Sequence, residues 1–280
     1  MKTGVVDVGG GMRGIYAAGI LDFCLRQGIH FDCCVGVSAG SANMASYLAG
    51  QQGRNRRFYL DYAFRKEYMS LGNLLRRGSY VDLDYVYGVL SRSGGEDPLD
   101  YEAMAQNPAE LVVVAEEAVS GRTRYFTKAD VRQDDYRIFM ASSALPGVNR
   151  PYEIGGTAYF DGALADPVPV RKAFDLDCDR VVLILTRPAD QPRAPGKDPA
   201  VARLIRRRYP SSARQLLLRA QRYNDGVELA RRYEAEGRLL LLAPDRLDGM
   251  STLARDREAL ERFYQKGTRD AEQICGFLAR

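Results

Sequence analysis

Hydrophobic positions in the first fifty residues follow two alternating patterns. Residues 4–8 form a short apolar, β-branched run that ends at three consecutive glycines, and residues 15–25 then place apolar side chains at helical spacing. Residues 31–37 again have the character of a strand, and residues 39–49 form a helix-like run of small side chains. Two successive strand–helix units predict a parallel β-sheet.

The rest of the chain continues this alternation. Residues 201–236 and 253–278 have helical spacing, and four prolines between residues 188 and 199 interrupt the pattern before them. We therefore expect an α/β fold, with residues 1–186 as one domain and residues 187–280 as a mostly helical extension packed on that domain. Further strand candidates are residues 111–115, 124–127, 181–186 and 239–243.

The composition, with 46% hydrophobic and 27% charged residues, is that of a soluble globular protein. The five cysteines are odd in number, which favours a reducing compartment, and we expect a cytoplasmic protein. No signal-peptide core precedes the first glycines, and no stretch approaches the ~20 apolar residues of a membrane span. One histidine and scattered cysteines supply no metal-ligand spacing, so we expect neither a metal nor another cofactor.

The net charge of +4 is unevenly distributed. From Arg187 to Arg222 the chain carries ten Lys and Arg residues against two Asp residues. A region of this kind binds phospholipid headgroups or nucleic acid phosphates, or it is a solvated helix face. We favour the solvated face, expect no nucleic acid partner, and leave open a peripheral contact with the inner face of the membrane.

A second region combines aromatic and basic side chains. Five aromatic residues lie between Phe58 and Tyr68, next to basic residues at positions 56, 57, 65 and 66. Two interpretations remain open for this region. It is either a lid that touches acyl chains and headgroups or an ordinary helix with a packed aromatic face.

Residues 36–40, Gly-Val-Ser-Ala-Gly, fit the Gly-x-Ser-x-Gly pentapeptide of a nucleophile elbow. A strand candidate precedes Ser38 and a helix candidate follows it, which is the context that the elbow requires. A serine hydroxyl needs a base to become a good nucleophile, and the only histidine is His30. Because His30 precedes the strand that ends at Ser38, we expect it at the opposite edge of the sheet and without a catalytic role.

The first glycine cluster allows two interpretations. Residues 9–14 fit the Gly-x-Gly-x-x-Gly fingerprint of dinucleotide binding, but Asp32 stands near the start of the second strand, whereas the fingerprint needs its acid at the end. We favour the other interpretation, in which the backbone N–H groups of Gly10 and Gly11 form an oxyanion hole. Arg13 either adds positive charge for a phosphate-bearing substrate or forms a salt bridge on the helix surface.

A carboxylate is the best candidate for the base. Residues 157–160 have the pattern of a strand, and Asp161 follows in a turn kept open by Gly162. A carboxylate just past a strand end is placed like a catalytic group in an α/β enzyme and can hydrogen-bond a serine hydroxyl directly. A turn or capping role is the alternative.

Four segments together resemble the patatin-like phospholipase family, because they occur along the chain in the same order and with about the same spacing as that family's motifs. The resemblance covers about residues 4–186, which makes residues 1–186 the expected catalytic domain, and the remainder is similar to the C-terminal extension of a bacterial subgroup. Two positions depart from the fuller family pattern: Val8 before the glycines and Ala163 after Asp161. The four segments are residues 9–14, 36–40, 141–147 and 159–163.

The resemblance implies a three-layer α/β/α sandwich around a mostly parallel sheet. It also implies a Ser-Asp dyad, with Ser38 as nucleophile and Asp161 as general base, and an oxyanion hole at Gly10, Gly11 and Ala39. The expected function is hydrolysis of fatty acyl esters of lipids, as in a phospholipase A or lysophospholipase. The alternative is a catalytically weak regulator on the same fold that binds lipid or protein.

Overall fold

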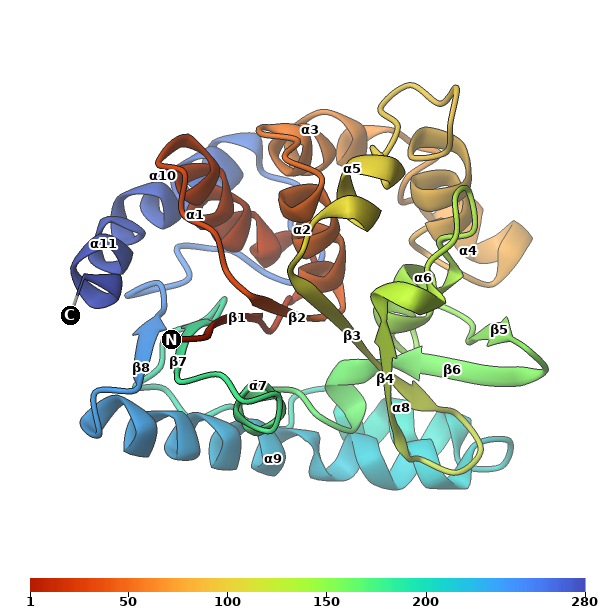
Figure 1. Ribbon diagram of the computed structural model, residues 1–280. Helices are drawn as coiled ribbons and strands as arrows, with labels where there is room; N and C mark the ends of the chain where they lie inside the picture. Colours follow the sequence, from red (N-terminus) through yellow and green to blue (C-terminus); the bar gives the residue numbers. More distant parts are fainter. Residues whose placement is uncertain (280) are drawn as a thin grey trace.

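One mixed β-sheet forms the middle layer of the molecule (Figure 1). The structure, a computed structural model, describes residues 1–279. The strands lie in the order β5-β6-β3-β2-β1-β7-β8, and β4 pairs with β3. Their bounds are β1 Thr3–Asp7, β2 Cys33–Val37, β3 Glu110–Glu117, β4 Thr123–Thr127, β5 Tyr152–Ile154, β6 Thr157–Asp161, β7 Arg180–Ile184 and β8 Leu239–Leu242.

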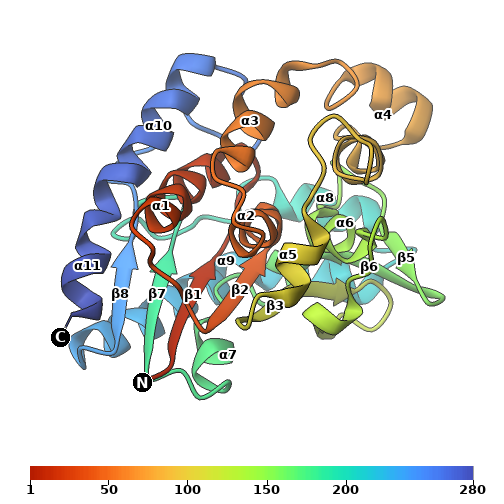
Figure 2. The same cartoon turned by 45° about the horizontal axis from the view of Figure 1, so that its top comes forward.

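The centre of the sheet is parallel, as the strand–helix alternation predicts. β1 pairs in parallel with β2 and β7, β2 with β3, and β7 with β8. The pairs β3–β4, β3–β6 and β5–β6 are antiparallel. Figure 2 shows the arrows of β8, β7, β1 and β2 pointing the same way. The residues that follow β1, β2 and β7 therefore meet at one edge of the sheet, where open α/β sheets bind their ligands.

Helices cover both faces of the sheet. α1, α2, α3 and α10 lie on one side of it in Figure 1, and α7 and α9 lie on the other. This arrangement confirms the expected α/β/α sandwich. The bounds are α1 Ile15–Arg26, α2 Ala39–Leu48, α3 Arg54–Leu60, α4 Leu71–Arg77, α5 Tyr101–Gln106, α6 Arg137–Ser143, α7 Val170–Phe174, α8 Asp198–Ile205, α9 Pro210–Ala235, α10 Arg257–Asp270 and α11 Glu272–Leu278.

Hydrophobic cores fill the space on each face of the sheet. Val5 of β1 packs with residues of α1 and α2, whereas its neighbour Val6 packs with residues of α9. Val182 and Leu183 of β7 divide between the two cores in the same way. Successive side chains of a strand point to opposite faces, and both faces are covered. This explains why the central strands appear in the sequence as continuous apolar runs.

The C-terminal extension is built into the same sandwich. Its strand β8 extends the sheet beyond β7, and its helix α10 crosses α1 at close range. A Cβ atom on Gly267 would lie 2.0 Å from the Tyr16 carbonyl oxygen, so the crossing requires glycine there. The Tyr264 hydroxyl donates to Asp22 at 2.8 Å across the same contact. The division of the chain at residue 186 stays a prediction.

The structure adds detail to three helical regions. The helical stretch 201–236 is two helices, because the chain turns after α8 and Pro210 begins α9. The stretch 253–278 likewise divides into α10 and α11. Of the two interpretations left open for the aromatic region, the burial of Phe58 and Tyr59 in α3 favours a packed aromatic face, whereas Phe64 and Tyr68 lie beyond the helix and are half-buried. Within residues 1–279, no helix has the length and apolar character needed to cross a bilayer.

Candidate active site

Ser38 occupies a strained turn between β2 and α2. Its backbone has φ 56° and ψ −131°, a positive φ that a residue with a Cβ atom rarely adopts. Conformations of this kind cost on the order of 1–3 kcal/mol and persist where the surroundings enforce them. The Ser38 N–H donates to the Ser142 hydroxyl oxygen at 2.9 Å, and Ser142 in turn donates to the Val114 carbonyl at 2.6 Å. Helix α6 thereby ties the turn to strand β3.

The glycines on either side of Ser38 are required by crowding. A Cβ atom on Gly36 would lie 2.5 Å from Cα of Ser41, and one on Gly40 would lie 2.4 Å from the carbonyl oxygen of Asp7. Helix α2 starts directly against β1 and β2 at this point. The local geometry is that of a nucleophile elbow, in which small residues let a strand turn sharply into a helix.

The glycine loop after β1 lies against this elbow. Gly9, Gly10 and Gly11 all have positive φ, at 65°, 127° and 59°. A Cβ atom on Gly9 would lie 2.2 Å from the Val37 carbonyl oxygen and 3.1 Å from the Ala39 nitrogen. In the part of the chain from residue 1 to 279, the N–H groups of Gly10, Gly11 and Ala39 donate no hydrogen bond to protein atoms.

A buried carboxylate fixes the start of the glycine loop. Asp7 is fully buried and accepts hydrogen bonds from the Gly9 N–H at 2.8 Å and from the Asn43 amide at 2.9 Å. Burial raises the pKa of Asp7 to about 6, and these two donors oppose the shift. Sequence reasoning missed both side chains. Their signal was weak, because an acid and an amide inside apolar runs are not by themselves marks of a site.

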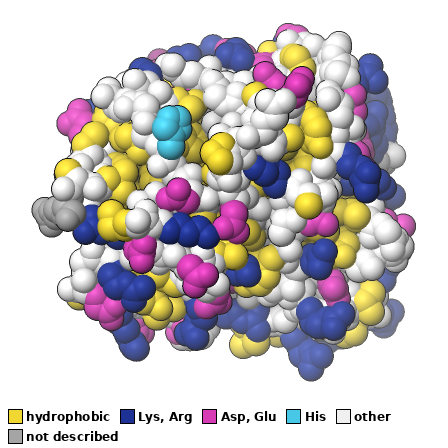
Figure 3. Space-filling model, viewed as in Figure 1, with side chains coloured by type: hydrophobic (Ala, Val, Ile, Leu, Met, Phe, Trp, Pro, Cys, Tyr) yellow, Lys and Arg dark blue, Asp and Glu magenta, His cyan; other side chains and the backbone are white. Residues whose placement is uncertain are grey.

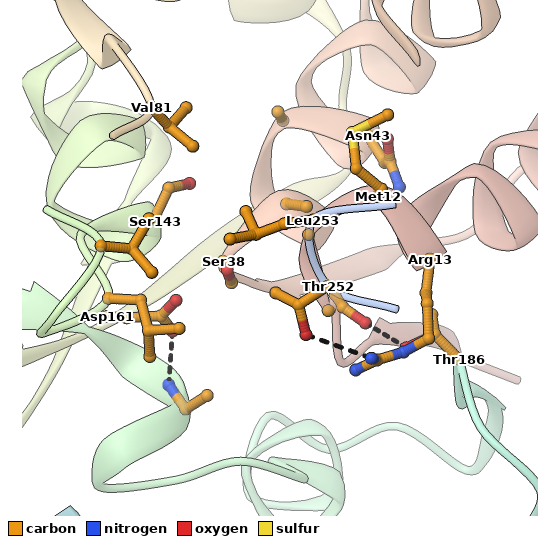
Figure 4. Close-up of a pocket in the computed structure, with 18 of the residues that line it drawn as sticks. Met12, Arg13, Ser38, Asn43, Val81, Ser143, Asp161, Thr186, Thr252 and Leu253 are labelled. Atoms are coloured by element: carbon orange, nitrogen blue, oxygen red, sulfur yellow. Dashed lines mark hydrogen bonds between the residues drawn. The ribbon is translucent and has the colours of Figure 1, made fainter. Parts of the chain in front are cut away.

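Asp161 is the last residue of β6 and lines the same pocket as Ser38 (Figure 4). It is 3% exposed, and its carboxylate accepts the Ala163 N–H at 2.8 Å. Burial raises the pKa of Asp161, while the Ala163 amide, the Ser38 hydroxyl and nearby arginines oppose the shift. The structure thus brings together two side chains that are 123 positions apart in the sequence.

His30 lies away from this pocket. It is exposed, and the single histidine of the chain is visible on the surface in Figure 3. It precedes the first residue of β2, Cys33, whereas Ser38 follows the last residue. Five strand residues at ~3.3 Å each separate the two ends. The placement agrees with the expectation that His30 is at the opposite edge of the sheet.

The pocket around Ser38 has a volume of about 180 Å³ and two chemically different sides. Figure 4 shows Val81 and Arg13 on opposite sides of Ser38. Part of the lining is apolar and is called here the apolar wall. It consists of Val81, its β-bridge partner Met69, and Phe58, Tyr68, Leu83, Val86 and Val148. The other side, called here the arginine cluster, consists of Arg13, Arg187, Arg193, Arg219 and Tyr223.

The arginine cluster corrects part of the interpretation of the basic region. Arg203 and Arg214 are exposed, as a solvated helix face requires, but Arg187, Arg193 and Arg219 line the pocket. Arg13 also turns into the pocket instead of forming a salt bridge on the helix surface, and it donates to the Thr252 hydroxyl at 3.1 Å.

Thr252 brings the C-terminal extension onto the glycine loop. Its carbonyl accepts the Met12 N–H at 3.0 Å, and a Cβ atom on Gly11 would lie 2.3 Å from that oxygen. Thr252 and Leu253 both line the pocket. No sequence signal pointed to this segment, because its contact with residues 11–13 depends entirely on the tertiary fold. Across residues 1–279, no cluster of three His, Cys, Asp or Glu side chains is arranged to hold a metal ion.

Comparison with known proteins places this geometry in a family. The E. coli K12 protein YjjU, described as uncharacterized, is 30% identical over 204 residues, which are 67% of this chain and 53% of YjjU. This chain therefore spans about half the length of that curated relative. The crystal structure of VipD from Legionella pneumophila is similar in fold, with a TM-score of 0.54 and 12% identity over 98% of this chain and 66% of VipD.

Two family models match separate parts of the chain. Residues 209–278 match a domain family of unknown function, DUF6363. Residues 8–174, more than half of the chain, match the model of the patatin-like phospholipases. The chain belongs to the patatin-like phospholipase family.

Proposed function

We propose that this protein hydrolyses fatty acyl esters of lipids with Ser38 as nucleophile and Asp161 as general base. The observation that carries the proposal is the pocket itself: a serine on a strained elbow and a buried carboxylate line one cavity, beside a glycine loop in which the N–H groups of Gly10 and Gly11 find no acceptor within residues 1–279. Membership of the family supports a lipid acyl hydrolase.

The proposed chemistry has two steps. Asp161 takes the proton of the Ser38 hydroxyl as the oxygen attacks the ester carbonyl, and it then passes the proton to the leaving alkoxide. The acyl group is now bound to Ser38. In the second step Asp161 takes a proton from water, the hydroxide attacks the acyl carbon, and the Ser38 oxygen leaves with the proton. The products are a fatty acid and an alcohol.

The oxyanion of each tetrahedral intermediate needs donors. The N–H groups of Gly10, Gly11 and Ala39 are the candidates, because none of them donates to a protein acceptor within residues 1–279. Donors held in place before the reaction stabilise developing charge without reorganising. Asp7 supports this role by holding the Gly9 N–H and with it the path of the loop.

The raised pKa of Asp161 suits a base. A carboxylate with an ordinary pKa attracts a serine proton only weakly, whereas one desolvated by burial attracts it more strongly. The Ala163 amide holds one carboxylate oxygen and so orients the other. The apolar wall supplies the surface that an acyl chain would bury.

Helix α4 is the candidate contact with the membrane. Leu71 and Leu75 are 70% and 86% exposed, and Arg76 and Arg77 follow them on the same short helix. At a bilayer surface with anionic headgroups, the exposed leucines would insert toward the acyl chains and the arginines would contact the headgroups. Met69, two residues before α4, lines the pocket, so the helix adjoins the entrance for lipid. Contact with the cytoplasmic side of the bilayer is part of this proposal.

A fluorophosphonate probe and a short p-nitrophenyl ester test the mechanism. The folded protein should label at Ser38 and hydrolyse the ester. Ser38→Ala should abolish both, and Asp161→Asn should lower hydrolysis by about 10²–10⁴-fold because the base is lost. His30→Ala is the matched control and should keep full activity. Folded protein that fails to label would favour a regulator that binds without turnover, and an active Asp161→Asn variant would exclude the dyad.

A further inference from the structure

The arginine cluster gathers positive charge from three separate parts of the chain. Arg13 follows the glycine loop, Arg187 and Arg193 lie in the loop after β7, and Arg219 projects from α9. The guanidinium groups of Arg187 and Arg193 lie over the ring of Tyr223, at 5.8 and 5.7 Å from its centroid. The aromatic ring therefore serves as a common platform for two cations.

Buried polar atoms in this cluster lack partners. Nε of Arg13, Nε of Arg187 and the hydroxyl of Tyr223 are buried and have no hydrogen-bond partner among residues 1–279. Buried polar groups in native proteins are nearly always hydrogen-bonded, so orphans of this kind require an explanation. The two nitrogens are donors, and the Tyr223 hydroxyl can donate as well. Three donors on one side of one pocket are suited to an oxyanion.

The charges of the cluster do not cancel. Asp198 binds Arg219 through two hydrogen bonds, at 2.5 and 2.9 Å, and lies 3.6 Å from Arg193. Asp161 lines the pocket itself, whereas Asp198 lies behind the arginines that it pairs with. Four arginines against two carboxylates leave two positive charges uncompensated. Burial and the charge of neighbouring arginines lower the pKa of Arg13 to about 10. Burial likewise lowers the pKa of Arg193 to about 10.

We infer that the arginine cluster binds a terminal phosphate of the substrate, so that the ester cleaved at Ser38 belongs to an acylated alcohol that carries a phosphate monoester. The inference rests on the proposed function and names its substrate class. A phosphate monoester carries about −1.5 to −2 charge at pH 7, which matches the uncompensated charge of the cluster, whereas a phosphodiester carries a single negative charge. Arginine is the side chain best suited to hold phosphate oxygens.

The arrangement around Ser38 fits such a substrate. The apolar wall receives the acyl chain on one side of Ser38, and the arginine cluster receives the phosphate on the other. The scissile ester, which joins these two parts of the molecule, is then held over the nucleophile. Binding energy from a group that does not react would position the carbonyl for attack.

Three oleoyl substrates that differ only at the headgroup test the inference: 1-oleoylglycerol 3-phosphate, 1-oleoylglycerol and 1-oleoylglycero-3-phosphocholine. We expect kcat/KM for the monoester to exceed that for both others by at least about tenfold. Arg187→Gln should lower the ratio of monoester to neutral substrate by about tenfold or more, because a charged hydrogen-bonding partner is lost. Tyr223→Phe, which removes only a hydroxyl, should lower it in the same direction.

Arg214→Gln is the matched control, because Arg214 is exposed on the same helix as Arg219. It should leave the ratio unchanged. The inference is overturned if the ratio of kcat/KM for the monoester to that for the neutral substrate is near one in the unmodified enzyme, or if Arg187→Gln leaves this ratio unaltered. Hydrolysis of the neutral substrate would in that case still support the proposed function.

Calorimetric titration with sn-glycerol 3-phosphate and with inorganic phosphate covers the case of a protein that hydrolyses none of the three substrates. Binding of glycerol phosphate that weakens in Arg187→Gln and not in Arg214→Gln would keep the phosphate subsite although the proposed function had failed. Absence of binding would overturn the subsite as well. A third outcome is an active enzyme that binds inorganic phosphate but hydrolyses the monoester and the neutral substrate with equal kcat/KM. The cluster would then be a site for free anion, and the assignment of a phosphate monoester substrate would be overturned.

Discussion

The hydroxyl of Ser142 accepts the backbone N–H of Ser38 at 2.9 Å and so joins helix α6 to the turn that carries the candidate nucleophile. Ser142 is fully buried, and its own proton goes to the Val114 carbonyl of β3. One hydroxyl therefore links three elements. The segment 141–147 is one of the four that resemble the family, and the sequence alone assigned it no role. The bridge gives Ser142 of this segment a structural role.

Ser142→Ala should weaken the elbow. The Ser38 N–H and the Val114 carbonyl would both lose a buried partner, which costs about 1–3 kcal/mol for each group. We expect a lower melting temperature and a lower kcat for the p-nitrophenyl ester. Ser143→Ala is the control for stability, because among residues 1–279 the Ser143 hydroxyl has one long hydrogen bond, of 3.4 Å to Tyr87. Equal stability of the two variants would show that the bridge does not hold the turn.

Gly9→Ala should prevent the glycine loop from lying against the elbow. The new Cβ atom would sit 2.2 Å from the Val37 carbonyl oxygen, and the φ of 65° is unfavourable for alanine. We expect a loss of about 2–5 kcal/mol in the free energy of unfolding, measured by urea denaturation. Gly28→Ala separates the two causes. Gly28 has a similar φ of 63° with nothing near its Cβ position, so the loss there should be about 1–2 kcal/mol.

Glu116 should make the protein less stable as the pH rises. Burial raises the pKa of Glu116 to about 8 from 4.5, so between these pH values the folded state keeps a proton that the unfolded state releases. The free energy of unfolding therefore falls as the pH increases from 4.5 to 8, by a few kcal/mol at most.

Glu116→Gln tests this linkage, because glutamine cannot titrate and can still accept the bond that the Ser212 hydroxyl donates at 3.1 Å. The variant should gain stability relative to the unmodified protein as the pH rises from 5 to 8. Parallel stability curves over this range would show that Glu116 titrates normally. Asp7 also has a raised pKa, which is why the difference between the two proteins is the quantity to measure.

Leu75→Glu should weaken binding to lipid vesicles that contain phosphatidylglycerol. The substitution places a negative charge on the exposed face of α4, where it meets anionic headgroups. Sedimentation with vesicles measures the bound fraction. Val119→Glu is the control, since Val119 is 71% exposed in the turn between β3 and β4 and does not line the pocket. Equal losses in both variants would indicate a general charge effect and not a contact through α4.

Local patterns in the sequence predicted the scaffold well. The units β1–α1 and β2–α2 each consist of a buried strand, a small-residue turn and a helix, and each of these has a signal within a few residues. Ser38 and Asp161 were identifiable because Ser38 directly follows β2 and Asp161 is the last residue of β6. Their catalytic roles stay predictions, and the experiments above decide them.

The arginine cluster was not predictable in the same way. Arg13 is separated from Arg187 and Arg219 by a long stretch of chain, and Arg187 and Arg219 stand in a segment where basic residues are common. Periodicity shows which face of a helix is polar, but it does not show whether that face meets solvent or a cavity. Three of the ten basic residues from Arg187 to Arg222 line the pocket. Which of the ten face the pocket and which face solvent is decided by the tertiary positions of α9 and of the loop after β7.

The contact between Thr252 and the glycine loop has a consequence for synthesis of the chain. Residues 9–14 leave the ribosome long before residue 252, yet the Met12 N–H finds its partner only when residue 252 has been made. At about 5–20 residues per second, 240 further residues take roughly 12–48 s. During that interval the nascent chain holds the nucleophile without a finished loop, so its proposed activity against lipids would begin only after residue 252 has been made.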